Sequence, residues 1–314
     1  MLRNTSVSLF VLSFLILISC KSKDMKKSDP SDTEQTMQEM VKTGIVNITA
    51  QDYKFLLPDT IPSGWTNIRF HNNGKETHFF MLNKIPDGIT FNEYLNALQP
   101  PFDNVIKALR DSGITQQEAG ERLMAQMPTW ISKVQTMGGS GLIEPGSTND
   151  FTLKLTPGNY EMECYIFTPK NAPHYELGMT SHVIVSDDST HMTPPEADIN
   201  LTLSDHKIIP DVEPTAGEHI VAVHFKDPQP FGLGDDIHLV ELTDTTDMDK
   251  VIEWMNWMNI NGLAAPAPAR FLGGVQEMPQ GYTEYFKVNF KPGNYAWIAE
   301  SYASQGMVSK FSID

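Results

Sequence analysis

The chain consists largely of short segments in which apolar and polar residues alternate, separated by Gly, Pro, Asn and Asp. Alternation with a period of two places the apolar side chains on one face of a β-strand, and the separating residues favour turns. The pattern therefore predicts half-buried strands of an all-β sandwich. The clearest segments carry apolar residues at Ile68 and Phe70, at Phe79 and Met81, at Phe151, Leu153 and Leu155, and at Val183 and Val185.

The sequence repeats itself once. Residues 151–160 (FTLKLTPGNY) match residues 286–295 (FKVNFKPGNY), and each copy is followed by Gly-Met and a closing alternating segment. Other landmarks, such as a Gly-Gly pair followed by Pro and Gly, occur in the same order in both halves. Such a repeat predicts a duplicated structural unit. We expect one sandwich over 44–187, a polar, proline-containing linker over 188–198 and a second sandwich over 199–314.

Each half also contains a segment with helical periodicity. In the first half it covers residues 91–109 and is interrupted by Pro100-Pro101, which we expect to break the helix. Thr115 then begins a capping box for a further helix that runs toward Val134. The second half has a shorter amphipathic segment over 248–258. We expect helices packed against one end or edge of each sandwich.

The N-terminus has the parts of a secretory signal in order, with Arg3, an apolar run over 7–18 and small residues before Cys20. The run is too short for a bilayer, which takes about 20 apolar residues. Its end, Leu-Ile-Ser-Cys, resembles the lipobox of bacterial lipoproteins, which implies a signal peptide over 1–20 and a lipidated Cys20. An ordinary secretory signal is the alternative. Residues 21–43 are polar, as in a tether. We expect a cell-envelope protein, anchored to a membrane by its lipid and facing the periplasm or cell surface.

The net charge limits the possible binding partners, and the cysteine count limits the possible roles of Cys164. A net charge of −16 argues against binding nucleic acid or an anionic membrane surface through a basic patch. The chain has two cysteines, so lipidation of Cys20 leaves Cys164 without a partner for a disulfide. A lone thiol in an oxidising compartment is buried and inert, reactive, or bound to a metal.

Two segments of the first half resemble the cupredoxin family of blue copper proteins. Residues 70–78 (FHNNGKETH) are similar to its apolar strand, Asn-x-Gly and ligand histidine. Residues 160–179 are similar to its strand that ends in a cysteine and is followed by a loop histidine and Gly-Met. The resemblance covers most of both halves and implies two Greek-key β-sandwiches in tandem, each with a helical insertion. It also implies one type 1-like copper ion, with three equatorial ligands and a weak axial one: His78, Cys164, His174 and Met179.

In one respect the first half departs from the family pattern. Nine residues separate Cys164 from His174, where the family usually has only a few, so a longer loop has to bring the imidazole back. The second half lacks the thiolate altogether, because Ala299 aligns with the cysteine while His238 and Met307 remain. We therefore expect no type 1 copper in the second half.

Three classes of function compete. The leading hypothesis is a copper protein that transfers electrons to or from a redox protein partner, or handles copper. A metal-free binding or scaffold module on the same fold is the alternative. Multicopper oxidases and nitrite reductases also use tandem cupredoxin domains, but they commonly carry His-x-His pairs, and this sequence has none. On that ground the chain is predicted not to be an enzyme.

Overall fold

The computed structural model describes residues 44–228 and 234–314. The predicted signal peptide, the lipidation site at Cys20 and the tether up to residue 43 lie outside the described residues. Within the described residues, no helix is both long enough and apolar enough to cross a membrane.

The first half folds into two sheets packed face to face. Its strands are β1 (Ile45–Ala50), β2 (Phe55–Leu56), β3 (Thr60–Asn72), β4 (His78–Lys84), β5 (Gln135–Ile143), β6 (Thr148–Leu155), β7 (Gly158–Glu163) and β8 (Thr180–Ser189). One sheet contains β1, β2, β3 and β6, and the other contains β5, β4, β7 and β8. Strand β3 joins both sheets, because its first residues pair with β8 and its later residues pair with β1 and β6.

The second half repeats this plan. Its strands are β9 (Ile199–Ser204), β10 (Lys207–Pro210), β11 (Gly217–Phe225), β12 (Ile237–Leu242), β13 (Arg270–Val275), β14 (Thr283–Phe290), β15 (Gly293–Ile298) and β16 (Val308–Ile313). The parallel β9–β11 pair corresponds to β1–β3, and the antiparallel β15–β16 pair corresponds to β7–β8. The predicted fold class, two cupredoxin-like sandwiches in tandem, is confirmed.

The repeated Pro-Gly-Asn-Tyr motif has the same role in both halves. The Tyr160 hydroxyl donates to the carbonyl of Thr156 at 2.7 Å, and the Tyr295 hydroxyl donates to the carbonyl of Lys291 at 2.9 Å. Each bond ties the start of a strand to the residue four positions earlier, as in the tyrosine corner of Greek-key sandwiches. The motif therefore fixes how the polypeptide turns into β7 and β15.

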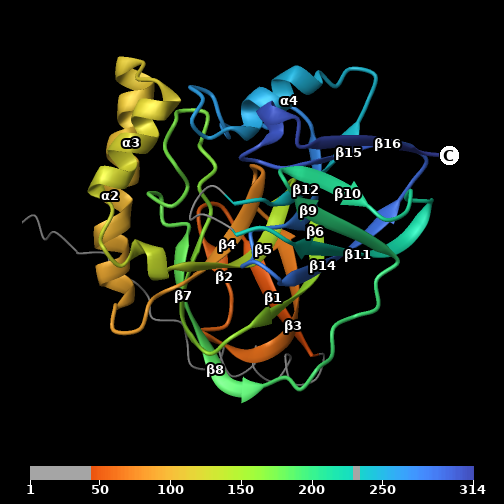
Figure 1. The fold of residues 1–314 in the computed structure, drawn as a ribbon, viewed down its shortest axis with the longest axis horizontal. Helices are drawn as coiled ribbons and strands as arrows, with labels where there is room; N and C mark the ends of the chain where they lie inside the picture. Colours follow the sequence, from red (N-terminus) through yellow and green to blue (C-terminus); the bar gives the residue numbers. More distant parts are fainter. Residues whose placement is uncertain (1–43, 229–233) are drawn as a thin grey trace, which may run out of the picture.

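The two sandwiches share continuous sheets, an arrangement that the sequence did not predict. Strand β6 pairs with β14 in one sheet, and β5 pairs with β13 in the other. Glycines allow the second pair to approach closely, since a Cβ added at Gly141 would lie 2.7 Å from the Cα of Gly274. The two sandwiches are thus joined by backbone pairing between strands (Figure 1).

Helices form a layer beside each sandwich. In Figure 1, α2 (Phe91–Ser112) and α3 (Gln116–Gln126) lie side by side next to β7, and α4 (Met248–Met255) lies over the second sandwich. The prediction that Pro100-Pro101 break the first helix is wrong, because α2 continues through both. Thr115 does cap α3, but the helix ends before it reaches Val134, and only a 3₁₀ turn, η1 (Ile131–Lys133), follows.

The helix layer changes the burial of the strand beneath it. Strand β4 was expected to be half-buried, yet both of its faces are covered. Phe80 and Leu82 point into the sandwich core, while Phe79 and Met81 lie on the outer face, under α2 and the segment that follows Cys164. The outer face of this sheet is therefore an interior surface.

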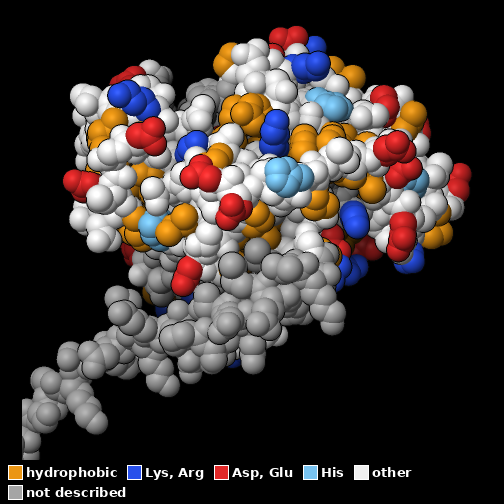
Figure 2. Space-filling model, turned by 90° about the horizontal axis from the view of Figure 1, so that it is seen from below, with side chains coloured by type: hydrophobic (Ala, Val, Ile, Leu, Met, Phe, Trp, Pro, Cys, Tyr) orange, Lys and Arg blue, Asp and Glu red, His pale blue; other side chains and the backbone are white. Residues whose placement is uncertain are grey.

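On the face shown in Figure 2, Lys and Arg side chains are scattered among Asp and Glu side chains. This distribution agrees with the acidic composition of the chain.

Candidate metal centre

Three of the four predicted ligands meet at one end of the first sandwich. His78 begins β4, Cys164 directly follows β7, and His174 lies in the loop before β8. The Cys164 Sγ atom is 3.8 Å from His78 Nδ1 and 3.6 Å from His174 Nδ1. All three side chains are buried, and their ligand atoms lie within 4.8 Å of one another.

These separations fit one small metal ion. Bonds of about 2.0 Å to nitrogen and about 2.3 Å to sulfur, set about 120° apart, place the sulfur and nitrogen atoms about 3.7 Å from each other. The two observed distances from Cys164 Sγ bracket this value. A soft thiolate with two imidazoles is a donor set that suits copper in both of its oxidation states. The residues present therefore fit a copper ion.

Met179 is close to the other ligands through the backbone. Its N–H donates to the carbonyl of His174 at 3.0 Å, and its carbonyl accepts from the N–H of Cys164 at 3.2 Å. Its side chain is fully buried. These backbone bonds place Met179 beside the group, and its role as axial ligand stays a prediction.

The long spacing between Cys164 and His174 is taken up by a small hairpin. The N–H of His174 donates to the carbonyl of Ile166 at 2.8 Å, and Phe167 pairs with Pro173. The extra residues of the loop form the hairpin beyond this pair. The His174 imidazole therefore lies beside the Cys164 thiol, as it would in a shorter loop. The hairpin docks elsewhere: Phe167 also pairs with Ala264 of the second sandwich.

Hydrogen bonds fix the orientation of His174. Its Nε2–H donates to the Glu76 carboxylate at 2.8 Å, so the Nδ1 lone pair faces Cys164. A ligand histidine whose second nitrogen donates to a carboxylate is a common feature of metal sites. The sequence does not identify Glu76, since nothing in it distinguishes this residue from other acids near a turn.

The loop between β3 and β4 is shaped around His78. The Asn72 side chain accepts from the N–H of Gly74 and donates to the carbonyls of Glu76 and Ile143. Gly74 has to lack a side chain, because a Cβ there would lie 2.7 Å from Nε2 of His78. The Asn-x-Gly motif thus holds the loop closed over the first ligand.

Burial keeps all three ligands uncharged in the absence of metal. Desolvation lowers the pKa of His78 to about 4 and, together with the neighbouring His78, lowers the pKa of His174 to about 3. Desolvation raises the pKa of Cys164 to about 12, although the backbone N–H groups of Phe79 and Ile166 oppose this shift. At neutral pH the metal-free centre therefore holds one thiol and two neutral imidazoles.

Copper binding is accordingly expected to release about one proton per chain at neutral pH, since only Cys164 has to lose one. Between the pKa values of the histidines and that of the thiol, affinity should rise about tenfold per pH unit. Proton release can be measured with an indicator dye in weak buffer, and affinity by competition with a chelator. Release of no proton, or of more than one, would contradict the assignment of charges.

The second sandwich has lost the centre, and the strand register corrects one assignment. In the β4–β7 pair, Lys84 lies opposite Tyr160 and Met81 lies opposite Glu163. In the β12–β15 pair, Glu241 lies opposite Tyr295, the repeat's equivalent of Tyr160, and His238 lies opposite Ile298. His238 is therefore the counterpart of Met81, and the prediction that it remains as a counterpart of His78 is wrong. The positions that correspond to the four ligands are Asp235, Ala299, Tyr302 and Met307.

A second buried group lies on the outer face of the second sandwich. Its members, Asp236, His238 and Glu300, have polar atoms within 4.8 Å of one another. The Leu142 N–H donates to Nδ1 of His238 at 3.0 Å, so the ring proton sits on Nε2 and is donated to Asp236 at 2.7 Å. Both ring nitrogens are engaged within the protein. The group is thus a hydrogen-bond network, which the Tyr165 hydroxyl extends by donating to Glu300.

No family model and no curated protein matches the chain. Among solved structures, auracyanin A, a "blue" copper protein from Chloroflexus aurantiacus, is similar at 19% identity and a TM-score of 0.27, over 45% of this chain and 98% of that one. A multicopper oxidase is similar at 13% identity and a TM-score of 0.22, over 86% and 88%. A copper-containing nitrite reductase from Thermus scotoductus SA-01 is similar at 11% identity and a TM-score of 0.21, over 86% and 61%. These values concern the fold alone.

The prediction that the chain is not an enzyme requires correction. It depended on the lack of a His-x-His pair, yet the structures that resemble the chain over 86% of its length are a multicopper oxidase and a nitrite reductase, which are enzymes. Two cupredoxin-like sandwiches in tandem therefore do not exclude catalysis.

Proposed function

We propose that the protein binds one copper ion between His78, Cys164 and His174, with Met179 as axial ligand, and uses it for electron transfer. The observation that carries the proposal is the pair of Sγ–Nδ1 distances, 3.8 and 3.6 Å, in a buried His–Cys–His group. Copper bound by this donor set supplies one-electron redox chemistry.

Electron transfer is favoured over copper delivery by the burial of the ligands. Handing an ion to another protein proceeds through a ligand that the acceptor can reach, but His174, Cys164 and His78 are at most 1% exposed. Electrons need no such access. Backbone bonds at Met179 and the Glu76 bond to His174 also hold the ligands in place, which limits rearrangement when the charge of the ion changes.

Glu76 marks the side from which a redox partner would approach. Its side chain is 19% exposed and bonded to the buried His174, so it joins the centre to the surface. A redox protein that docked over Glu76 would be separated from the ligand His174 by the Glu76 side chain alone. The lipid proposed at Cys20 would hold the chain on a membrane of the cell envelope, facing the periplasm or the cell surface.

A Cys164→Ser variant tests the proposed centre. Wild-type protein given Cu(II) is expected to develop an intense visible thiolate-to-copper band and to retain about one copper per chain, because Cys164 supplies the thiolate. The variant should lose the band entirely. Visible spectra and metal analysis after gel filtration measure both.

The other cysteine provides the matched control. Cys20→Ser removes a thiol at the proposed lipidation site and should leave the band and the copper content unchanged. Absence of the band from wild-type protein that retains no copper would reject the copper centre and favour a metal-free binding module.

A further inference from the structure

The hairpin between Cys164 and His174 lies between α2 and the second sandwich, and its position decides where the His174 imidazole lies. Bonds within the hairpin run from the N–H of Thr168 to the carbonyl of Ala172 and from the N–H of Asn171 to the carbonyl of Thr168. A two-stranded hairpin is at best marginally stable on its own in water. Contacts with neighbouring elements are therefore needed to hold it in one place.

Helix α2 holds the hairpin at its base and at its tip. The Tyr175 hydroxyl donates to the Asp103 carboxylate at 2.6 Å, and the Tyr175 side chain is buried. A bond of this length from a hydroxyl to a charged oxygen belongs to the stronger class of hydrogen bonds. At the tip, the Arg110 guanidinium donates to the carbonyl of Asn171 at 2.8 Å. Since Tyr175 directly follows His174, the first bond fixes the backbone next to a ligand.

The second sandwich holds the other strand of the hairpin. The N–H of Phe167 donates to the carbonyl of Leu263 at 2.9 Å, and the carbonyl of Phe167 accepts from the N–H of Ala265 at 2.7 Å. The hydroxyl of Tyr165, the residue after the thiol ligand, donates to Glu300 at 3.0 Å. Both strands of the hairpin are therefore attached to elements outside it.

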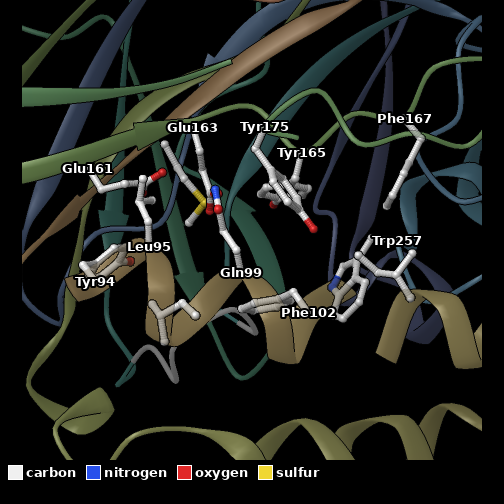
Figure 3. A pocket seen from close by; sticks show the side chains of 13 residues that line it. Tyr94, Leu95, Gln99, Phe102, Glu161, Glu163, Tyr165, Phe167, Tyr175 and Trp257 are labelled. Atoms are coloured by element: carbon white, nitrogen blue, oxygen red, sulfur yellow. The ribbon is translucent and has the colours of Figure 1, made fainter. Parts of the chain in front are cut away.

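The Phe167 ring occupies the space between the helix and the second sandwich. It is fully buried, and the Arg110 guanidinium lies 3.8 Å from its centroid. Figure 3 shows Phe167 and Tyr175 directed toward α2, where Phe102 lies beside Trp257, with ring centroids 6.0 Å apart. Because Trp257 follows α4, α2 and the second sandwich contact each other as well as the hairpin.

We propose, on the basis of the proposed copper centre, that α2 and the second sandwich together position His174 for copper by holding this hairpin, with Tyr175 and Asp103 as positioning residues. Glu76 orients the ring of His174, whereas the hairpin contacts fix the backbone that carries the ring. Nine residues separate Cys164 from His174, so the length of the loop alone does not set the Sγ–Nδ1 distance of 3.6 Å. The helical insertion and the second sandwich thereby share a role in the centre.

Hydrogen–deuterium exchange of full-length, metal-free protein tests the hold on the hairpin without copper. In Asp103→Ala the peptide over residues 166–178 should exchange about tenfold faster than in wild type, because loss of a hydrogen bond to a charged group makes local opening easier. Tyr175→Phe should do the same, and combining it with Asp103→Ala should add little, because both changes remove the same bond. Asp103→Asn keeps an acceptor oxygen and should stay close to wild type.

Copper-loaded protein tests the positioning itself. Asp103→Ala should bind copper about tenfold more weakly than wild type. The thiolate-to-copper band and the reduction potential of the bound copper should also shift, because the distance between His174 and Cys164 is no longer fixed. A contact that served stability alone would leave both unchanged. Asp111→Ala is the matched control, since it removes an exposed carboxylate on the same helix that pairs with Lys107, and it should change none of these quantities.

Tyr165→Phe tests the part of the second sandwich, because it removes the hydroxyl bonded to Glu300 and should also speed exchange of the hairpin. Unchanged exchange in Asp103→Ala or in Tyr165→Phe would overturn the proposal, and so would faster exchange in Asp103→Ala with the band and potential of wild type. Wild-type protein that binds no copper, with faster exchange in both variants, would instead reject the copper centre and uphold the hold on the hairpin. The two failures are thus distinguishable.

Discussion

Replacing Phe80 by alanine is expected to lower the free energy of unfolding by about 3–5 kcal/mol. The side chain is fully buried between the sheets of the first sandwich, with its ring centroid 4.9 Å from that of Phe70 and 5.8 Å from that of Phe151. Strand β4 pairs with β5 on one side and β7 on the other, so it cannot move to fill the cavity. Denaturant unfolding measures the change.

A surface leucine provides the comparison. Leu177 is 45% exposed, and its replacement by alanine should change stability by no more than about 0.5 kcal/mol. If Phe80→Ala cost no more than Leu177→Ala, the ring could not be at the centre of the core. Phe80→Leu should lie between the two, because it retains much of the buried apolar volume.

The strands were predictable because their signal is local. Apolar residues alternate in β3, β6 and β8 as the two faces of a half-buried sheet require, and the repeated Pro-Gly-Asn-Tyr motif forms the same corner twice. The sharing of sheets between the sandwiches was not predictable in this way. Pairing of β5 with β13 depends on which strand edges meet, and no property of one strand identifies its neighbour.

Tertiary contacts account for the errors in the helices and in strand burial. Pro100-Pro101 would break an isolated helix, yet Val105 and Leu109 in the second part of α2 pack against α3, and this packing outweighs the lost backbone bonds. The same helix layer buries the outer face of β4. Local periodicity describes an element alone and does not report what covers it.

The candidate centre was predictable as a set of residues but not as an environment. The resemblance to the cupredoxin pattern named His78, Cys164, His174 and Met179, and the structure brings the ligand atoms of the first three together. In the second half, assigning His238 by residue type failed, since register is set by pairing with β15. The partner of His174 was not predictable either, because it depends on a contact across 98 residues.

Because the hydrogen bond from His174 to Glu76 positions a copper ligand, Glu76→Ala should weaken copper binding about tenfold to a hundredfold. The carboxylate holds the ring of His174 so that Nδ1 faces Cys164, and without it the ring can rotate or take the other tautomer. Competition with a chelator measures the affinity. The thiolate-to-copper band of any copper that remains bound should shift, because the position of one nitrogen ligand relative to the sulfur changes.

Glu76→Gln distinguishes the effect of orienting the His174 ring from the effect of the negative charge of Glu76. Its amide oxygen can still accept from His174 Nε2, so this variant should bind copper more tightly than Glu76→Ala if orientation is the main contribution. Glu213→Ala is the control, since it removes an exposed carboxylate of the second sandwich and should leave the copper affinity and the band unchanged. Wild-type affinity and an unshifted band in Glu76→Ala would mean that the buried loop alone positions His174, and Glu76 would then have no role in the centre.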